Sequence, residues 1–319
     1  MDVPKDFTVV SNPDLHRERA RALVAAHPEL KNLMGTDPWP AAIIFLLVAA
    51  QTAVAIAFEV YDVSGYWILL TAVFVGSVFN HWLAMGVHES SHQLIFKGFA
   101  ASRWLAIFAN MPVIVPGAMT FFRWHMDHHI YLGREKLDND LPSNAEADIV
   151  GNSGFKKAMW LFFYPFFGTL ARGFMRKPDS WEWKNIVCEV IYVGTIVYFF
   201  GWLPIGYLLL SSYIGMGPHP VAAHWIHEHY TWRQGQETYS YYGPLNWVTF
   251  NVGYHFEHHD LIMIPAKNLP KVRKIAPEFY EGKDGHRSWS RTMLRFIFDK
   301  RLSHYSRLVR RPQTIDPGT

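Results

Sequence analysis

Cysteine is almost absent from this sequence: Cys188 is the only one, and it stands inside an apolar run. A single cysteine excludes an intrachain disulfide and any cysteine-ligated zinc or iron–sulfur site. Charged residues are also scarce, at 18% of the chain against 50% hydrophobic residues, which is unusual for a soluble domain. The net charge of +3 comes from scattered basic residues, so nucleic-acid binding is not expected.

The N-terminus lacks two common membrane-targeting signals. Met1-Asp2-Val3-Pro4-Lys5 has no signal-peptide pattern, and Asp2 stands where N-myristoylation needs glycine. We expect residues 1–38 to form a polar, partly helical segment at the membrane surface or in the aqueous phase, without chemistry of its own. Its helix is expected to be capped by Asp14 and to break at His27-Pro28.

Long apolar runs predict four membrane-spanning helices, arranged as two hairpins. Ala41–Val60 and Tyr66–Val87 form the first hairpin, and each is long enough to cross roughly 30 Å of hydrocarbon as a helix. Asn185–Leu203 and a helix continuing from Pro204 through Ala223 form the second. The sequence therefore indicates an all-α integral membrane protein in which His88 directly follows the second span.

The segment between the hairpins is mixed in character. The apolar stretch Trp104–Met119 is interrupted by Pro112 and Pro116, and Ala158–Leu170 is too short to span comfortably. Both stretches are more typical of interfacial or re-entrant helices. We expect a single domain over residues 1–319, made of an N-terminal segment, a hairpin, a central segment, a second hairpin and a C-terminal region: 1–38, 41–87, 88–184, 185–223 and 224–319.

Lysine and arginine are absent from both predicted hairpin turns. Residues 1–40 contain five, 88–184 contain eleven and 233–319 contain fourteen, which accounts for all 30. Because lysine and arginine are enriched in the cytoplasmic segments of membrane proteins, we expect all three segments in the cytoplasm. The predicted fold is four transmembrane helices in two hairpins with a cytoplasmic helical cap.

Histidine, in contrast, is abundant and clustered in three boxes. The boxes are His88-Glu89-Ser90-Ser91-His92, His125-Met126-Asp127-His128-His129 and His255-Phe256-Glu257-His258-His259. Offsets of three and four residues lie on one face of a helix, so each box can direct its imidazoles to one place. With 17 histidines in 319 residues, two His-x-x-His-His runs are expected about 0.001 times by chance. The repeat therefore predicts a metal site.

The eight box histidines are more than one zinc ion would use, because zinc usually takes four ligands. Two metal ions sharing one pocket fit better. An all-nitrogen, two-metal site at a membrane surface favours iron and dioxygen chemistry, in which hydrogen is removed from an unactivated C–H bond. The apolar surroundings would exclude water and accept a long alkyl chain.

A ninth ligand is expected between Gly217 and His229, where the chain leaves the fourth span. His224 is the first choice, because it lies where a membrane-exit helix would face the pocket, and His219 and His229 are the alternatives. Nearby carboxylates are interpreted as groups that orient imidazole N–H groups or bind basic residues, with simple solvation as the alternative. These carboxylates are Glu89, Asp127, Glu228 and Glu257, and Asn251 is a further candidate ligand or ligand partner.

Two alternatives use the same residues differently. His88-Glu89-x-x-His92 matches the zinc metalloprotease signature, in which the glutamate is the general base. A membrane protease of this kind would leave both His-x-x-His-His boxes unexplained. The other alternative is a zinc-stabilised receptor or scaffold without catalysis. Metal analysis separates these possibilities: two irons per chain, one zinc, or a zinc with no turnover.

Several further motifs surround the boxes. They are Asn80-His81, Trp124 to Gly133, Asp138-x-Asp140-Leu141-Pro142, His219-Pro220, Glu228-His229-Tyr230, Glu237 to Asn246, Asn251 to Asp260, Leu269 to Ala276 and Tyr305-Ser306-Arg307. With the boxes and spans, they resemble the membrane fatty-acid desaturase superfamily and, within it, the sphingolipid Δ4-desaturases. The resemblance runs over nearly the whole chain, and the tyrosine-rich run at 237–246 is its most specific part.

The resemblance implies oxidation of the C4–C5 bond of the sphinganine backbone in dihydroceramide, giving the trans double bond of ceramide. Two iron ions would be the cofactor and dioxygen the co-substrate. Electrons from NAD(P)H would arrive through a separate carrier, either cytochrome b5 with its reductase or a ferredoxin-type protein. His219-Pro220 is followed by Val221-Ala222 rather than by the Gly-Gly of the cytochrome b5 haem motif, so the carrier is expected to be another chain.

A second product is compatible with the same resemblance. Desaturases and hydroxylases share the first hydrogen abstraction, so a C4-hydroxylase or a bifunctional enzyme making phytoceramide is the alternative. The enzyme would lie in the endoplasmic reticulum of a eukaryote or in the inner membrane of a bacterium. No substrate-binding residue is predicted.

Replacing His258 with alanine is expected to abolish turnover and to lower the bound metal, because it removes a predicted imidazole ligand. Metal content per chain and product formation measure both effects. His27→Ala and His286→Ala, outside the boxes, are the controls and should leave activity largely intact. Normal product formation by His258→Ala would remove this residue from the ligand set.

Overall fold

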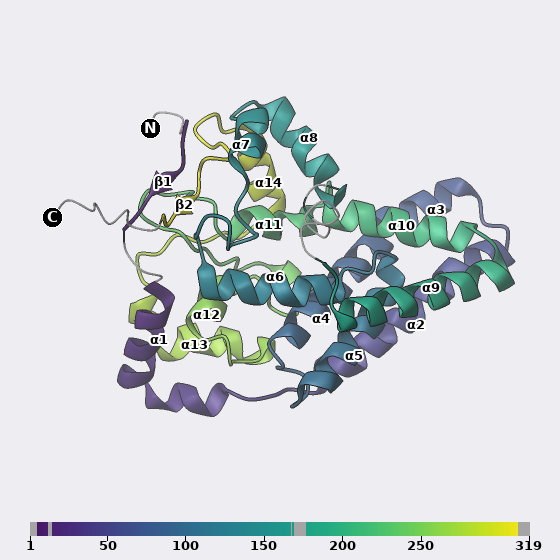
Figure 1. Ribbon diagram of the computed structural model, residues 1–319, viewed down its shortest axis with the longest axis horizontal. Coiled ribbons are helices and arrows are strands. Elements are labelled where there is room, and N and C mark those ends of the chain that lie inside the picture. Colours follow the sequence, from purple (N-terminus) through teal and green to yellow (C-terminus); the bar gives the residue numbers. More distant parts are fainter. Residues whose placement is uncertain (1–4, 12–14, 167, 169–176, 312–319) are drawn as a thin grey trace.

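The computed structural model describes residues 5–11, 15–166, 168 and 177–311, and most of its secondary structure is helical (Figure 1). The longer apolar helices are α2 (Trp39–Val60), α3 (Gly65–Thr71), α4 (Ser77–Ser91), α5 (Phe99–Asn110), α6 (Ala118–Tyr131), α9 (Ser180–Phe200) and α10 (Leu203–Met216). The other elements are β1 (Thr8–Val9), α1 (Leu15–Ala26), α7 (Asn144–Val150), α8 (Gly154–Tyr164), α11 (His224–His227), α12 (His255–Asp260), α13 (Leu269–Ile275), α14 (Trp289–Phe298) and β2 (Leu308–Val309).

These two sets of elements occupy different parts of the molecule. In Figure 1, α2, α3, α9 and α10 extend to the right, where both hairpin turns lie. The shorter elements lie on the left and at the top of the view, and β1 pairs in parallel with β2 near both chain ends. One end of the helix bundle is therefore covered by a cap of short elements from the N-terminal, central and C-terminal parts of the chain.

Three helices in the described part of the chain are long and apolar enough to cross a membrane: α2, the continuous helix Gly65–Ser91 and α9. These helices coincide with three of the predicted spans. The second continues farther than expected, because a π-helical turn at Ala72–Gly76 joins α3 to α4 without a break. His88 consequently lies in the last turn of this helix rather than after it.

The expectation of one helix from Pro204 through Ala223 is wrong. α10 is 14 residues long and ends at Met216, and a separate 3-10 turn follows at Pro220–Ala223. Pro218 and Pro220 explain the end of the helix, because residues before proline disfavour the α conformation. A helix of about 21 Å is also shorter than the roughly 30 Å of hydrocarbon in a bilayer.

The proline-interrupted stretch forms a sharp bend. Residues Phe99–Val113 and Ala118–Tyr131 meet at 118°, as in a broken span or a re-entrant loop. Asn110 closes the bend, since its Oδ1 accepts from the Ala118 backbone N–H at 2.8 Å and its Nδ2 donates to the Val115 carbonyl at 2.7 Å. The bend leads the chain into α6, which packs against α4.

Two other expectations concern short segments. α1 ends at Ala26, before His27-Pro28, as predicted, while Asp14 lies outside the described residues. Of the stretch 158–170, residues 158–164 belong to α8, and residues 167, 169 and 170 lie outside the described part.

Asn80, in the first turn of α4, links the bend to the neighbouring helices. Its Nδ2 donates to the Pro112 carbonyl at 3.0 Å, to Ser212 Oγ of α10 at 2.7 Å and to the Leu208 carbonyl of α10 at 3.3 Å. Its Oδ1 accepts from Gln51 Nε2 of α2 at 3.0 Å, and its side chain is fully buried. One buried amide side chain thus connects α4 to α2, to α10 and to the bend.

Replacing Asn80 with alanine is expected to lower the free energy of unfolding by about 2 kcal/mol, because it removes four contacts worth about 0.6 kcal/mol each in a membrane protein. Unfolding in mixed micelles by added denaturant measures the change. Asn144→Ala, at an exposed position in α7, is the matched control and should leave stability nearly unchanged. Equal stability of the two variants would contradict a structural role for Asn80.

Candidate metal centre

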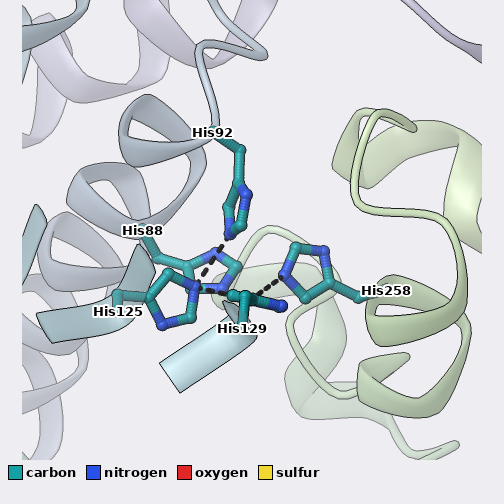
Figure 2. Close-up of side chains that lie close together, drawn as sticks. All are labelled: His88, His92, His125, His129 and His258. Atoms are coloured by element: carbon teal, nitrogen blue, oxygen red, sulfur yellow. Dashed lines mark hydrogen bonds between the residues drawn. The ribbon is translucent and has the colours of Figure 1, made fainter. Parts of the chain in front are cut away.

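Nine histidine side chains converge in two groups beside the end of α4. Group A contains His88, His92, His125, His129 and His258, and group B contains His128, His229, His255 and His259. Within each group, one nitrogen atom per ring lies within 4.8 Å of every other. Figure 2 shows group A, in which side chains from three different parts of the chain point toward one another.

Each His-x-x-His-His box is divided between the groups. On α6, His125 and His129 are one helical turn apart and belong to group A, while His128 belongs to group B. On α12 the division is reversed, because His258 belongs to group A and His255 and His259 to group B. Each box was expected to direct all its imidazoles to one place. Instead, the boxes on α6 and α12 each contribute imidazoles to both groups.

The distances between imidazole nitrogens fit metal ligation. In group A, His92 Nε2 lies 2.8 Å from His125 Nε2, and His258 Nε2 lies 3.2 Å from His129 Nε2. In group B, His255 Nε2 lies 2.8 Å from His229 Nε2. Two nitrogens bound at right angles to one ion, each about 2.1 Å from it, are about 3.0 Å apart. The residues present therefore fit one metal ion per group.

Burial lowers the pKa of most of these imidazoles and so keeps them in the form that binds metal, whereas the Asp138 carboxylate outweighs burial at His128 and raises its pKa. Loss of water lowers the pKa of His229, His255, His258 and His259 well below the ordinary value of 6.5. A neutral imidazole has the free lone pair that a metal ligand requires. All of group B is buried, whereas His125 and His129 of group A are partly exposed. Access from outside is therefore greater on the side of group A.

Two carboxylates lie behind rings of group B. Asp138 Oδ1 lies 2.8 Å from His128 Nδ1, and Asp138 Oδ2 accepts from the Gly133 backbone N–H at 2.7 Å, so Asp138 holds the His128 ring in place. Glu228 Oε1 lies 3.2 Å from His255 Nδ1, which is an ion-pair distance without a hydrogen bond. No role was predicted for Asp138 from the sequence, although it follows the second box by only nine residues.

Glu257, Glu89 and Asn251, which were also predicted near the ligands, form hydrogen bonds to neighbouring segments of the chain. Glu257 accepts from Ser240 Oγ at 2.5 Å and from the Tyr242 hydroxyl at 2.8 Å, which fastens α12 to the tyrosine-rich run. Glu89 accepts from the Ala266 N–H, and Asn251 donates to the Ala266 carbonyl. Neither these side chains nor Asp127 belongs to group A or group B.

His224, the preferred ninth ligand, lies outside both groups. Its ring packs 3.8 Å from Trp225 and 4.7 Å from His81. The reason is the early end of α10: the chain turns at the prolines, so the segment after it does not continue the helix toward the groups. His219 is also outside them, and its Nδ1 accepts from the Val221 N–H. His229, one of the two alternatives predicted from the sequence, lies in group B and is the ninth histidine of the two groups.

The metalloprotease alternative does not fit this arrangement. His88 and His92 do lie together, but they share group A with three more imidazoles. Glu89 faces the Ala266 N–H at 2.8 Å and is absent from the group, so it is not placed as a general base on a metal-bound water.

Helices long enough to cross a bilayer, joined to an all-histidine centre, define the class of membrane desaturases. Residues 64–291 match the fatty acid desaturase family, and residues 3–39 match the sphingolipid Δ4-desaturases. The chain belongs to the sphingolipid Δ4-desaturase family, and it is an oxidoreductase.

The similarity to named relatives extends over nearly the whole chain. The chain is 42% identical over 310 residues to a rice protein named sphingolipid delta(4)-desaturase DES1-like, covering 96% of this chain and 93% of that protein. It is 40% identical to human sphingolipid delta(4)-desaturase DES1 and 41% identical to human sphingolipid delta(4)-desaturase/C4-monooxygenase DES2. Each comparison covers 96% of this chain and 95% of the human protein.

His229→Ala is expected to lower the iron content below two ions per chain, because it removes one of four group B ligands, while His224→Ala should still bind two. Metal analysis of chains purified as folded protein in detergent measures this. The pair is matched, because both residues are buried histidines five positions apart. The opposite pattern would restore His224 to the ligand set.

Proposed function

We propose that this chain introduces the trans C4–C5 double bond into the sphinganine backbone of dihydroceramide and releases ceramide. Nine histidines would hold two iron ions, one in each group. The overall reaction consumes one dioxygen, two electrons and two protons, and it releases two water molecules besides the unsaturated lipid. Two hydrogen atoms leave the lipid, one from C4 and one from C5.

The observation that supports this proposal most directly is the identity of 40–42% over 96% of the chain with proteins named sphingolipid delta(4)-desaturase. All eight histidines predicted from the boxes lie in groups A and B, together with His229. The match at residues 3–39 adds support for a sphingolipid over other acyl lipids.

The chain's own residues would hold the iron ions and orient their ligands. They would not exchange protons with the lipid. Iron bound in the two groups would supply the dioxygen chemistry that removes hydrogen from the alkyl chain. Asp138 would fix the orientation of His128, Glu228 lies beside His255, and Glu257 holds α12. Phe121 stacks on His125 at 4.9 Å and keeps an apolar surface beside the partly exposed side of group A. An alkyl chain that approaches there meets a site with little water.

The cytoplasm is the proposed location of the site. Helix α12, which carries the third box, lies on the opposite side of Figure 1 from both hairpin turns. The turns contain no lysine or arginine. Electrons would come from NAD(P)H through a separate carrier, either cytochrome b5 with its reductase or a ferredoxin-type protein. In a eukaryote the membrane would be the endoplasmic reticulum, and in a bacterium the inner membrane.

C4-hydroxylation is the second candidate activity. Human and mouse proteins named sphingolipid delta(4)-desaturase/C4-monooxygenase are 41% and 40% identical to this chain. The identities are as high as those to the desaturases, so the two products are candidates for one site. Which one forms depends on small differences in the position of C4 and C5 relative to the metal.

Expression in a host that lacks Δ4-desaturation, with an added electron carrier and dihydroceramide, is expected to yield ceramide with a trans C4–C5 double bond. Mass spectrometry of the extracted lipids identifies the product and separates it from phytoceramide. The His258→Ala chain is the control and should yield neither lipid. If an iron-loaded wild-type chain left dihydroceramide unchanged, or placed the double bond elsewhere, the proposed function would be wrong.

A further inference from the structure

Helix α1 contacts the ligand-bearing helix α12 through one buried carboxylate. Asp260 ends α12 and is 3% exposed. Its Oδ1 lies 2.7 Å from His16 Nδ1, and its Oδ2 accepts from Arg19 at 2.9 Å and from the Tyr280 hydroxyl at 3.1 Å. The Arg19 guanidinium thus binds both carboxylate oxygens, a geometry that fixes direction as well as distance.

The same two α1 residues reach farther into the site. His16 Nε2 lies 2.9 Å from Thr238 Oγ1, and its ring is 5.1 Å from the ring of His259 in group B. The Arg19 guanidinium lies 4.7 Å above the ring of Phe256, between two ligands of α12. His16 and Arg19 therefore contact both the end of α12 and the side chain in its first turn.

An apolar interface supports these polar contacts. Leu23 and Leu30, from α1 and the turn after it, pack in one buried cluster with Phe256, Leu261 and Val272. The side-by-side placement of α1, α12 and α13 is visible at the lower left of Figure 1. Next along the chain, Asp37 binds Lys267 at 2.7 Å. Residues 16–37 thus cover the region on both sides of the third histidine box.

The contacts matter because α12 has only six residues. A helix this short is unstable by itself, so its neighbours decide its position. Glu257 holds it on one side through Ser240 and Tyr242, and Asp260 holds it through α1 on the other. The placement of three of the nine proposed ligands depends on the position of α12, because this helix carries them.

The family comparison points to the same segment. The fatty acid desaturase match covers residues 64–291, whereas the match to sphingolipid Δ4-desaturases covers residues 3–39. Helix α1, which contacts α12, lies inside this second matched segment.

We propose that His16 and Arg19 are positioning residues that set the orientation of α12 through Asp260 and so place His255, His258 and His259 around the metal ions. The proposal rests on the proposed function, because its kinetic consequence is measured on that reaction. Contacts behind metal ligands commonly change metal affinity or activity by about 10- to 100-fold.

Arg19→Ala is expected to lower kcat about tenfold or more with KM changed less than about twofold, since the lipid surface is intact and the ligands are displaced. The loaded variant should also release iron to a chelator about tenfold faster than wild type. Arg21→Ala removes the same charge from an exposed position of α1 and should match wild type in both assays. His16→Asn keeps a donor toward Asp260 and should retain more activity than His16→Ala.

Identical iron release and identical kcat in the Arg19 and Arg21 variants would overturn the positioning role. A merely structural role predicts instead that Arg19→Ala matches wild type at temperatures well below its own melting temperature. Iron release needs no lipid, so it tests the role of α1 even if the wild-type chain fails to convert dihydroceramide. That failure would count against the proposed function alone.

Discussion

Nine imidazoles that meet nitrogen to nitrogen place the strictest requirement on this fold. Buried polar atoms without partners cost about 1–3 kcal/mol each, and nitrogens such as His88 Nε2 and His259 Nε2 have no hydrogen-bond partner within the described chain. A cation between such nitrogens would replace the missing partners. The nitrogen atoms of the rings repel one another, so the surrounding helices must hold the rings in place. The rest of the structure can be understood from this requirement.

The membrane helices meet this need by fixing the ends of α4 and α6. Asn80 ties α4 to α2, α10 and the bend before α6, and Asn110 closes that bend. Polar side chains inside a membrane segment are retained where they satisfy backbone groups that lipid cannot. The bend therefore has a structural reason: it directs α6 back along α4, so that the second box lies beside the first at the end of α4.

In the cap, the rings are held in place by other contacts, because α12 is too short to be stable by itself. Carboxylates on both sides of its histidines fasten it to segments distant in sequence, Glu257 to the tyrosine-rich run and Asp260 to α1. The match of residues 3–39 to the sphingolipid Δ4-desaturases thus includes residues of α1 that contact α12.

Local patterns were sufficient for much of this protein. Apolar runs predicted the first apolar helix as Ala41–Val60 against the observed Trp39–Val60, and spacing selected eight histidines that all lie in groups A and B. The same reasoning was wrong about the helix that two prolines end at α10. Because it assumed a continuous helix there, it favoured His224, which lies outside both groups, over His229, which lies in group B. The role of Asp138 was also missed, since an aspartate in a loop has no pattern that marks it as a partner of His128.

The sequence by itself determined that imidazoles at helical spacing lie near the ends of apolar spans, because spacing and hydropathy are local properties of the chain. Only the tertiary structure decided which ring belongs to which group. That division depends on how α6 and α12 are rotated relative to each other, and their facing rings, His258 and His129, are 129 positions apart. Such a rotation follows from packing and from buried contacts like that of His16 with Asp260, which no stretch of neighbouring residues contains.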